Sequence, residues 1–399
     1  MPTPRNSLLS KLLGKVPLQA ILIVPFVVQV VGIVGIVGYL SFRNGQTAIA
    51  DLASQLQNEV SSRINQHLDR LLATPRQINQ INLDAYELEN LNLEDLDRTG
   101  RYFYKQMKVF DDVGYINFAS VKGEFVGIGR EDDGTLYMIK MRSTDGGRYK
   151  QYAMNNDGKP IRVTATEDYD FTEEAWYSDA VKVGKPIWTS IYNWEDRPEI
   201  MSISSSYPVY DRNRKMLGVI GIDLILSQIS KFLKDVNVSS SGKIFILERD
   251  GLIVASSSRE KIYRIVGGKG ERMNISESED ALIQAAGEQL IQHFGNFQKI
   301  SKSERLDFKF NQDRQFMQVI PWRDRLGLDW LIVVVIPESD FMAKINANTR
   351  TTIWLSIVAL IFALALGILT SRWVIEPLIR LNFAAKGIAR GEWDKTVDI

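Results

Sequence analysis

Two long stretches without charge constrain this chain more than any other feature. Residues 16–42 and 351–371 carry no charged side chain over 27 and 21 residues, and both are mostly aliphatic. About 20 apolar residues are enough to cross a bilayer as a helix. We therefore predict two transmembrane helices at these positions. A cleaved signal peptide is the alternative for the first, but its apolar run is too long and no A-x-A site follows it.

The charges beside these segments predict their orientation. Residues 1–15 precede the first segment with basic residues and no acid, and residues 372–399 follow the second with five basic residues. Positive flanks stay in the cytoplasm. Both ends should therefore face the cytoplasm, with residues 43–350 on the outer side of the membrane. The basic flanking residues are Arg5, Lys11 and Lys15, and then Arg372, Arg380, Lys386, Arg390 and Lys395.

The composition excludes several classes of protein. The 399 residues include 48 basic and 48 acidic side chains and no Cys. Balanced charge gives no sign of nucleic-acid binding, and the lack of Cys removes disulfides, thiolate metal sites and Cys nucleophiles. His67 and His293 are too distant in sequence to suggest a metal site. No nucleophile has an adjacent base and no P-loop occurs, so we expect no catalytic residue, metal or cofactor in this chain.

The region between the two apolar segments begins with a helical pattern. Apolar residues recur every three or four positions, which predicts a stalk helix over residues 44–82. Its apolar stripe must pack on its own domain or on the same helix of a second subunit. The stripe consists of Ile49, Leu52, Leu56, Val60, Ile64, Leu68 and Leu71.

From about residue 113 the apolar period changes to two, which is typical of strands. Hairpins are expected around Lys122-Gly123 and Arg249-Asp250-Gly251, and each begins a pattern that ends in a strand followed by a helix. This weak internal repeat predicts an α+β fold of two mixed modules in series, a membrane-distal one at 83–225 and a membrane-proximal one at 226–345. Further strands are expected at 136–141, 161–166, 200–209, 217–222, 314–320 and 330–336, and helices at 224–236 and 278–294.

Several stretches resemble the double Cache sensor domains of bacterial transmembrane receptors and sensor histidine kinases. They are AWYSDAVKVGKPIWTSIY, the strand pair SISSSYPVYD and GVIGIDL, and GKIFILERDGLIVASS. The resemblance covers residues 44–345 and implies a long helix leaving the membrane, two PAS-like modules, and a ligand in the distal one.

The last residues, 372–399, resemble the first helix of a HAMP domain. Pro377 and an apolar seam with heptad-like spacing carry this resemblance, and such a seam suits a parallel homodimer. A whole HAMP domain needs more residues, so we expect an output domain beyond Ile399. The seam consists of Leu378, Leu381, Ala385 and Ile388.

The Cache resemblance also implies ligand-binding residues. Trp176 and Tyr177 match the pair on the pocket wall, Tyr192 matches the next pocket tyrosine, and Asp223 matches the aspartate that takes a ligand ammonium. Glu174 stands where amino-acid-binding members have the arginine that binds the ligand carboxylate. The residues that match the binding site for a ligand ammonium are thus partly kept, whereas the arginine that binds a ligand carboxylate is absent.

A second departure follows Tyr192. Trp194 stands where the family has an aspartate, although Glu195 and Asp196 come next. The segment DYDFTEEAWYSDA, residues 168–180, has five acids, four aromatic residues and no base. Together these features favour a cationic amine without a carboxylate, held by aromatic faces and by Asp223.

Each candidate also has a purely structural interpretation. Trp176 and Tyr177 could pack the core, Asp223 could cap the helix that follows it, and Glu174 could be a solvated charge. Functionally, we expect a transmembrane receptor for a small ligand with a histidine kinase as its output. The alternatives are a nucleotide or diguanylate cyclase, a chemoreceptor, or a membrane-anchored binding or structural protein without signalling.

Overall fold

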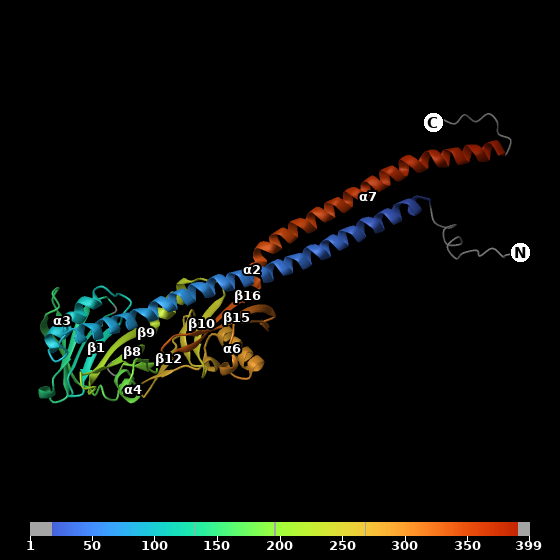
Figure 1. The fold of residues 1–399 in the computed structure, drawn as a ribbon. Coiled ribbons are helices and arrows are strands. Elements are labelled where there is room, and N and C mark those ends of the chain that lie inside the picture. Colours follow the sequence, from blue (N-terminus) through green and yellow to red (C-terminus); the bar gives the residue numbers. More distant parts are fainter. Residues whose placement is uncertain (1–17, 132, 195–196, 268, 390–399) are drawn as a thin grey trace. The chain divides into compact units, whose positions relative to one another are not determined.

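The computed structural model describes residues 18–131, 133–194, 197–267 and 269–389 and divides into two units (Figure 1). One unit contains the chain up to Leu52 and from Phe341 onward, and the other contains Ala53–Asp340. Two long helices, α2 (Leu18–Glu87) and α7 (Ser339–Ala389), each run from one unit into the other.

Both long helices contain a segment that is long and apolar enough to cross a membrane, within Val27–Glu87 of α2 and Ile353–Lys386 of α7. A helix in the core of a soluble domain would bury these side chains. Here no residue in the most apolar window of either helix is buried within the chain. Val28 and Phe362, for example, are each 65% exposed. Such exposure fits a lipid environment, in agreement with the two predicted spans.

Helix α2 is longer than the sequence pattern indicated. It continues through Pro75 and ends at Glu87, beyond the expected limit of the stalk at residue 82. Proline removes one backbone hydrogen bond from a helix. Leu72 and Ile78, on either side of Pro75, are both buried, and this packing offsets the loss.

The stalk part of α2 packs on its own domain and lies along the sheets of both modules (Figure 1). Gln57 Nε2 donates to the carbonyl of Phe316 at 3.0 Å in the proximal module. Further along the helix, Asn79 Nδ2 donates to the carbonyl of Ser205 at 2.7 Å in the distal module. The apolar stripe is buried at Val60, Ile64, Leu68 and Leu71, whereas Leu52 is 52% exposed.

The distal module is one antiparallel sheet with a helix on each face. The strand order is β5-β4-β3-β2-β1-β9-β8-β6, and β7 also pairs with β8. Helix α3 (Leu96–Met107) packs on one face and α4 (Ala175–Val183) on the other. The strands are β1 (Tyr115–Ser120), β2 (Phe125–Arg130), β3 (Leu136–Met141), β4 (Arg148–Met154), β5 (Pro160–Asp168), β6 (Ile187–Trp188), β7 (Tyr192–Asn193), β8 (Met201–Tyr210) and β9 (Met216–Ile225).

The proximal module has a smaller antiparallel sheet of order β11-β10-β16-β15-β14 and a separate hairpin of β12 and β13. Helix α5 (Leu226–Asp235) joins it to the distal module, and α6 (Ala281–Phe294) packs on β10 and β14. The strands are β10 (Lys243–Glu248), β11 (Ile253–Ser256), β12 (Tyr263–Val266), β13 (Lys269–Arg272), β14 (Glu304–Phe310), β15 (Asp313–Arg323) and β16 (Asp329–Pro337), and 3-10 turns lie at Ser143–Asp145, Ile275–Glu277 and Phe297–Lys299.

The structure confirms the predicted α+β class and both early hairpins. Gly123 and Gly251 occupy the two turns with φ of +82° and +90°, a region that favours glycine. Helix α5 begins at Leu226, two residues later than predicted, because β9 continues to Ile225. Helix α3 and the strands β4 and β14 were not predicted at all.

Candidate functional site

A cavity of about 40 Å³ lies on the α4 face of the distal sheet. Its polar lining consists of Asn117, Glu174 and Asp223, and no lysine or arginine of the described residues lines it. Most of the remaining wall is aromatic: Tyr115, Phe125, Tyr137, Tyr149, Tyr169, Trp176, Tyr192 and Trp194.

Strand alternation places these side chains on one face of the sheet. In β1, Tyr115 and Asn117 face the cavity while Ile116 and Phe118 pack in the core beneath α3. Asp223 in β9 lies directly opposite Tyr115 in the register, so both reach the same cavity. The sheet therefore supplies the floor of the site, and α4 with the β7 segment supplies its walls.

Gly221 leaves room for this arrangement. It pairs with Asn117 in the register, and its amide donates to Asn117 Oδ1 at 3.1 Å. A Cβ atom at this position would lie 2.5 Å from that oxygen and 2.9 Å from Cε3 of Trp176. Gly127 and Gly129 in β2 similarly leave space for the rings of Tyr115 and Tyr137. These glycines let large aromatic rings lie flat on the sheet.

Asp223 is the most unusual group in the cavity. Its side chain is 3% exposed, and Oδ2 accepts a hydrogen bond of 2.8 Å from the hydroxyl of Tyr192. Oδ1 has no hydrogen-bond partner among the described residues. Burial raises the pKa of Asp223 to about 6, although the hydrogen bond from Tyr192 lowers it. A buried carboxylate with an unused acceptor attracts a cationic donor.

The position of Asp223 rules out its interpretation as a helix cap. It lies inside β9, and the residue at the N-cap of α5 is Ile225, which makes no side-chain capping bond. In the sequence, Asp223 precedes a helical pattern. In the structure, β9 continues two residues beyond Asp223, and the Asp223 side chain lines the cavity.

Tyr192 is a neutral donor in this site. Burial and the charge of Asp223 raise the pKa of Tyr192 well above its usual value, so the hydroxyl keeps its proton. Beside it, Trp194 packs edge-on against Tyr115 at 5.5 Å, and its indole N–H donates to Ser202 Oγ at 2.8 Å. Glu195 and Asp196, which the sequence also suggested, lie outside the described residues.

Three more predicted residues lie on or beside α4. Glu174 is at the N-cap position, makes no capping bond with its side chain, and lines the cavity half-buried. Trp176 is 2% exposed and also lines the cavity. Tyr177 does not line it. Its ring packs against Phe171 at 5.0 Å and Trp176 at 5.6 Å, so its place is in the core.

The acidic segment contributes less charge to the site than its composition suggested. Of its five acids, only Glu174 lines the cavity. Asp168 forms an ion pair of 3.2 Å with Arg148, and Asp179 accepts hydrogen bonds from the backbone and hydroxyl of Ser190. Among the described residues, the acids that line the cavity are therefore Glu174 and Asp223, and Asp223 lies outside the segment.

Sequence reasoning missed the aromatic residues on the sheet: Tyr115, Phe125, Tyr137 and Tyr149. One signal was present, because β2 reads FVGIGR, with glycines at alternate positions beside strands rich in tyrosine. Glycines on one face of a strand indicate a close approach by large neighbours.

This architecture is that of a two-module sensor domain with a cavity in its first module. The chain belongs to the Cache domain family, whose family model matches residues 45–345. With a candidate transmembrane helix on each side of that region, it is a Cache sensor of the transmembrane receptor type.

Curated relatives with the same region are methyl-accepting chemotaxis proteins. McpC of Bacillus subtilis is 25% identical over 227 residues, which are 57% of this chain and 30% of the relative. McpA of Pseudomonas putida is 23% identical over 235 residues, 57% of this chain and 32% of the relative. The chain spans about a third of the length of the curated relatives it matches.

Solved structures similar to this chain include two chemoreceptor domains. A methyl-accepting chemotaxis protein X has a TM-score of 0.47 and 16% identity, with 73% of this chain and 98% of the other covered. The ligand-binding domain of the amino-acid chemoreceptor PctB of Pseudomonas aeruginosa, in complex with L-Arg, has a TM-score of 0.44 and 15% identity, with 75% and 92% covered.

Proposed function

We propose that this chain is the sensing part of a receptor in the inner membrane of a bacterium. Residues 43–350 lie outside the membrane, the distal module binds a small ligand, and α7 carries the signal inward. The Cache family membership and the exposed apolar helices support this topology. The basic flanks of the two apolar segments support the orientation.

The ligand of the distal cavity is a cationic amine without a carboxylate. The observation that carries this proposal is Asp223, a buried carboxylate with an unused oxygen in a cavity where Glu174 is the only other acid among the described lining residues. A ligand ammonium would donate to Oδ1 and lie against the faces of Trp176 and Tyr192. A ligand carboxylate would meet two acids and no basic residue of the described lining.

The size of the cavity restricts the ligand further. About 40 Å³ accommodates about three water-sized groups, on the basis of about 10–15 Å³ for each. A compact amine or a narrow ammonium head group fits this space. A long, branched or aromatic amine would have to displace the ring of one of the wall residues.

We propose a cytoplasmic signalling output for this receptor. Residues 372–399 resemble the start of a HAMP domain, which supports a signalling output such as a histidine kinase. The similarity to methyl-accepting chemotaxis proteins favours a second candidate, the chemoreceptor output. Either output fits a parallel homodimer. Leu381 in α7 is 58% exposed within the single chain, as an unpaired dimer seam would be.

A thermal-shift screen of the full chain in lipid nanodiscs tests the ligand class. The panel holds methylammonium and ethanolamine against alanine, asparagine and glutamate. A ligand at about a hundred times its Kd adds about 2.7 kcal/mol of stability. We expect only the amines to raise Tm, and Asp223→Asn to abolish the rise.

Asp168→Asn is the matched control, because Asp168 is an exposed acid of the same segment that faces away from the cavity. It should respond to amines like the unmodified protein. A Tm rise with neutral or acidic amino acids that persists in Asp223→Asn would contradict the proposed ligand class.

A further inference from the structure

A second cavity lies in the proximal module and has the opposite charge. It measures about 590 Å³ and is formed by the C-terminal end of α5, the linker 237–243 and the loop after β11. Its charged lining consists of Lys234, Lys243, Arg259 and Asp280. These residues come from four separate segments and take no part in the amine site.

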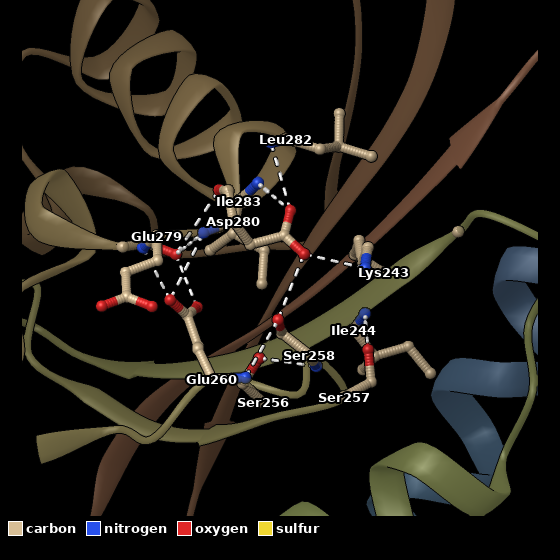
Figure 2. A network of polar contacts seen from close by, with 12 residues as sticks. Lys243, Ile244, Ser256, Ser257, Ser258, Glu260, Glu279, Asp280, Leu282 and Ile283 are labelled. Carbon is tan, nitrogen blue, oxygen red and sulfur yellow. Dashed lines mark hydrogen bonds and ion pairs between the residues drawn. The ribbon is translucent and has the colours of Figure 1, made fainter.

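Asp280, the only acid among the described residues of this lining, is already neutralised (Figure 2). Asp280 Oδ2 accepts hydrogen bonds from Lys243 Nζ at 2.8 Å and Ser258 Oγ at 3.2 Å, and Oδ1 accepts from the first amides of α6, those of Leu282 and Ile283. Burial raises the pKa of Asp280, but the hydrogen bond and charge of Lys243, with Ile283 and Ser258, lower it more. Asp280 therefore stays ionised and balances Lys243.

Glu260, which follows Arg259 in the sequence, is also engaged. Glu260 accepts hydrogen bonds from the hydroxyl of Ser278 and from the amides of Glu279 and Asp280, and Figure 2 shows its carboxylate directed at that turn. It therefore serves the N-terminal end of α6 and does not pair with the basic residues of the cavity.

Lys234 and Arg259 remain without a partner. Within the described ranges neither side chain makes a hydrogen bond or an ion pair, whereas Arg197, Arg249 and Arg272 of the same unit are all paired with acids. Two positive charges therefore face the cavity without neutralisation. Unpaired charges of one sign in a concave site concentrate ions of the opposite sign.

Ser257 adds a hydrogen-bond donor to the same wall. Its oxygen accepts the amide of Ile244 at 2.9 Å (Figure 2), and its hydroxyl proton has no acceptor among the described residues. Ser241 holds the linker that lines this cavity in place. Its hydroxyl donates to Asp340 at 2.6 Å and its amide donates to the same carboxylate at 2.9 Å.

We propose that this cavity binds a small dianionic oxyanion, a phosphate group, through Lys234, Arg259 and Ser257. Two unpaired cations match a charge of about −2, which a phosphate monoester approaches at pH 7. Arginine and lysine together suit phosphate oxygens, the first as a planar fork of donors and the second as a point charge. The phosphate belongs to a soluble molecule or to a lipid head group.

Titration of the full chain with inorganic phosphate tests the proposal. The chain is held in nanodiscs of phosphatidylcholine at pH 7.5 and constant ionic strength, and binding is followed by calorimetry, with acetate as the singly charged comparison. We expect saturable phosphate binding and at least about tenfold weaker acetate binding. Lys234→Gln and Arg259→Gln should each weaken phosphate binding about tenfold, the loss of one charge-assisted hydrogen bond.

Lys309→Gln is the matched control, because Lys309 is an exposed lysine of β14 outside this cavity, and its phosphate affinity should not change. Both cavity variants should keep the amine response of the distal site. A second titration in nanodiscs containing phosphatidic acid, whose head group is a phosphate monoester, identifies the source: loss of phosphate binding indicates an occupying lipid head group, and unchanged binding indicates a soluble ligand. No saturable binding, equal affinity for acetate, or full affinity in both cavity variants would overturn the proposal.

Discussion

The hydroxyl of Tyr192 donates a hydrogen bond of 2.8 Å to Oδ2 of Asp223. The two residues come from different strands, β7 and β9, and β8 lies between them in the sheet. The bond therefore joins the wall of the cavity to its floor. It satisfies one oxygen of a buried carboxylate, and the other remains for a ligand.

Tyr192→Phe should lower the free energy of unfolding by about 1–3 kcal/mol at pH 7.5, because it leaves a buried carboxylate oxygen without its donor. Tyr210→Phe is the comparison, since that hydroxyl donates to the carbonyl of Gly184 at an exposed position. Its cost should be under about 1 kcal/mol. Urea unfolding of both variants measures the difference, and equal costs would show that the Tyr192 bond is not special.

The raised pKa of Asp223 predicts how stability depends on pH. In the unfolded chain the carboxyl titrates near its ordinary value of 3.8, and in the folded protein near 6. A raised pKa stabilises the fold below the unfolded value, and this contribution is lost as pH rises through 6. The difference corresponds to about 3 kcal/mol.

Asp223→Asn imitates the protonated form and should not show this loss. Without ligand, its stability relative to the unmodified protein should rise by up to about 3 kcal/mol between pH 4 and pH 7.5. Chemical denaturation at the two pH values measures this. A relative stability that stays constant over this range would mean that Asp223 is not buried as an acid.

Gly221→Ala should damage the amine site directly. The added methyl group would lie 2.5 Å from Asn117 Oδ1 and 2.9 Å from Cε3 of Trp176, so both cavity-lining side chains would have to shift. We expect a loss of about 1–3 kcal/mol of stability and no amine-induced rise in Tm. Circular dichroism confirms whether the variant is folded. A folded variant with normal amine binding would contradict the placement of the cavity.

The HAMP-like seam predicts a parallel dimer. Because the chain has no native Cys, Leu381→Cys should crosslink to its copy under mild oxidation in membranes. Asn382→Cys, the next residue along the helix, points about 100° away and should crosslink several-fold less. Equal crosslinking at the two positions would contradict the predicted seam.

Much of this fold could be predicted from the sequence, because alternating apolar residues and glycine turns are local signals. The two early hairpins and the strands 136–141 and 243–248 follow from them. The cavity did not follow from such signals. All six residues of β1 are buried, so alternation could not tell which face held Tyr115 and Asn117 and which faced the core.

Charge composition also could not predict which acids line the cavity. The count of acids in residues 168–180 could not show that Asp168 and Asp179 are paired elsewhere, since side-chain direction depends on contacts distant in sequence. Asp223 was proposed through the family resemblance, whereas its place inside β9 and its unpartnered Oδ1 could be found only in the structure.

The central claim is that a ligand ammonium pairs with the ionised carboxylate of Asp223, and the pH dependence of amine affinity tests it most directly. The Kd of the best amine from the screen is measured by calorimetry on the full chain between pH 5 and pH 8. With a carboxyl pKa of about 6, affinity should be about tenfold weaker at pH 5 than at pH 7.5, and Asp223→Asn should remove both the affinity and its pH dependence. Amine affinity that is constant across this range, or that increases toward pH 5, would contradict the claim.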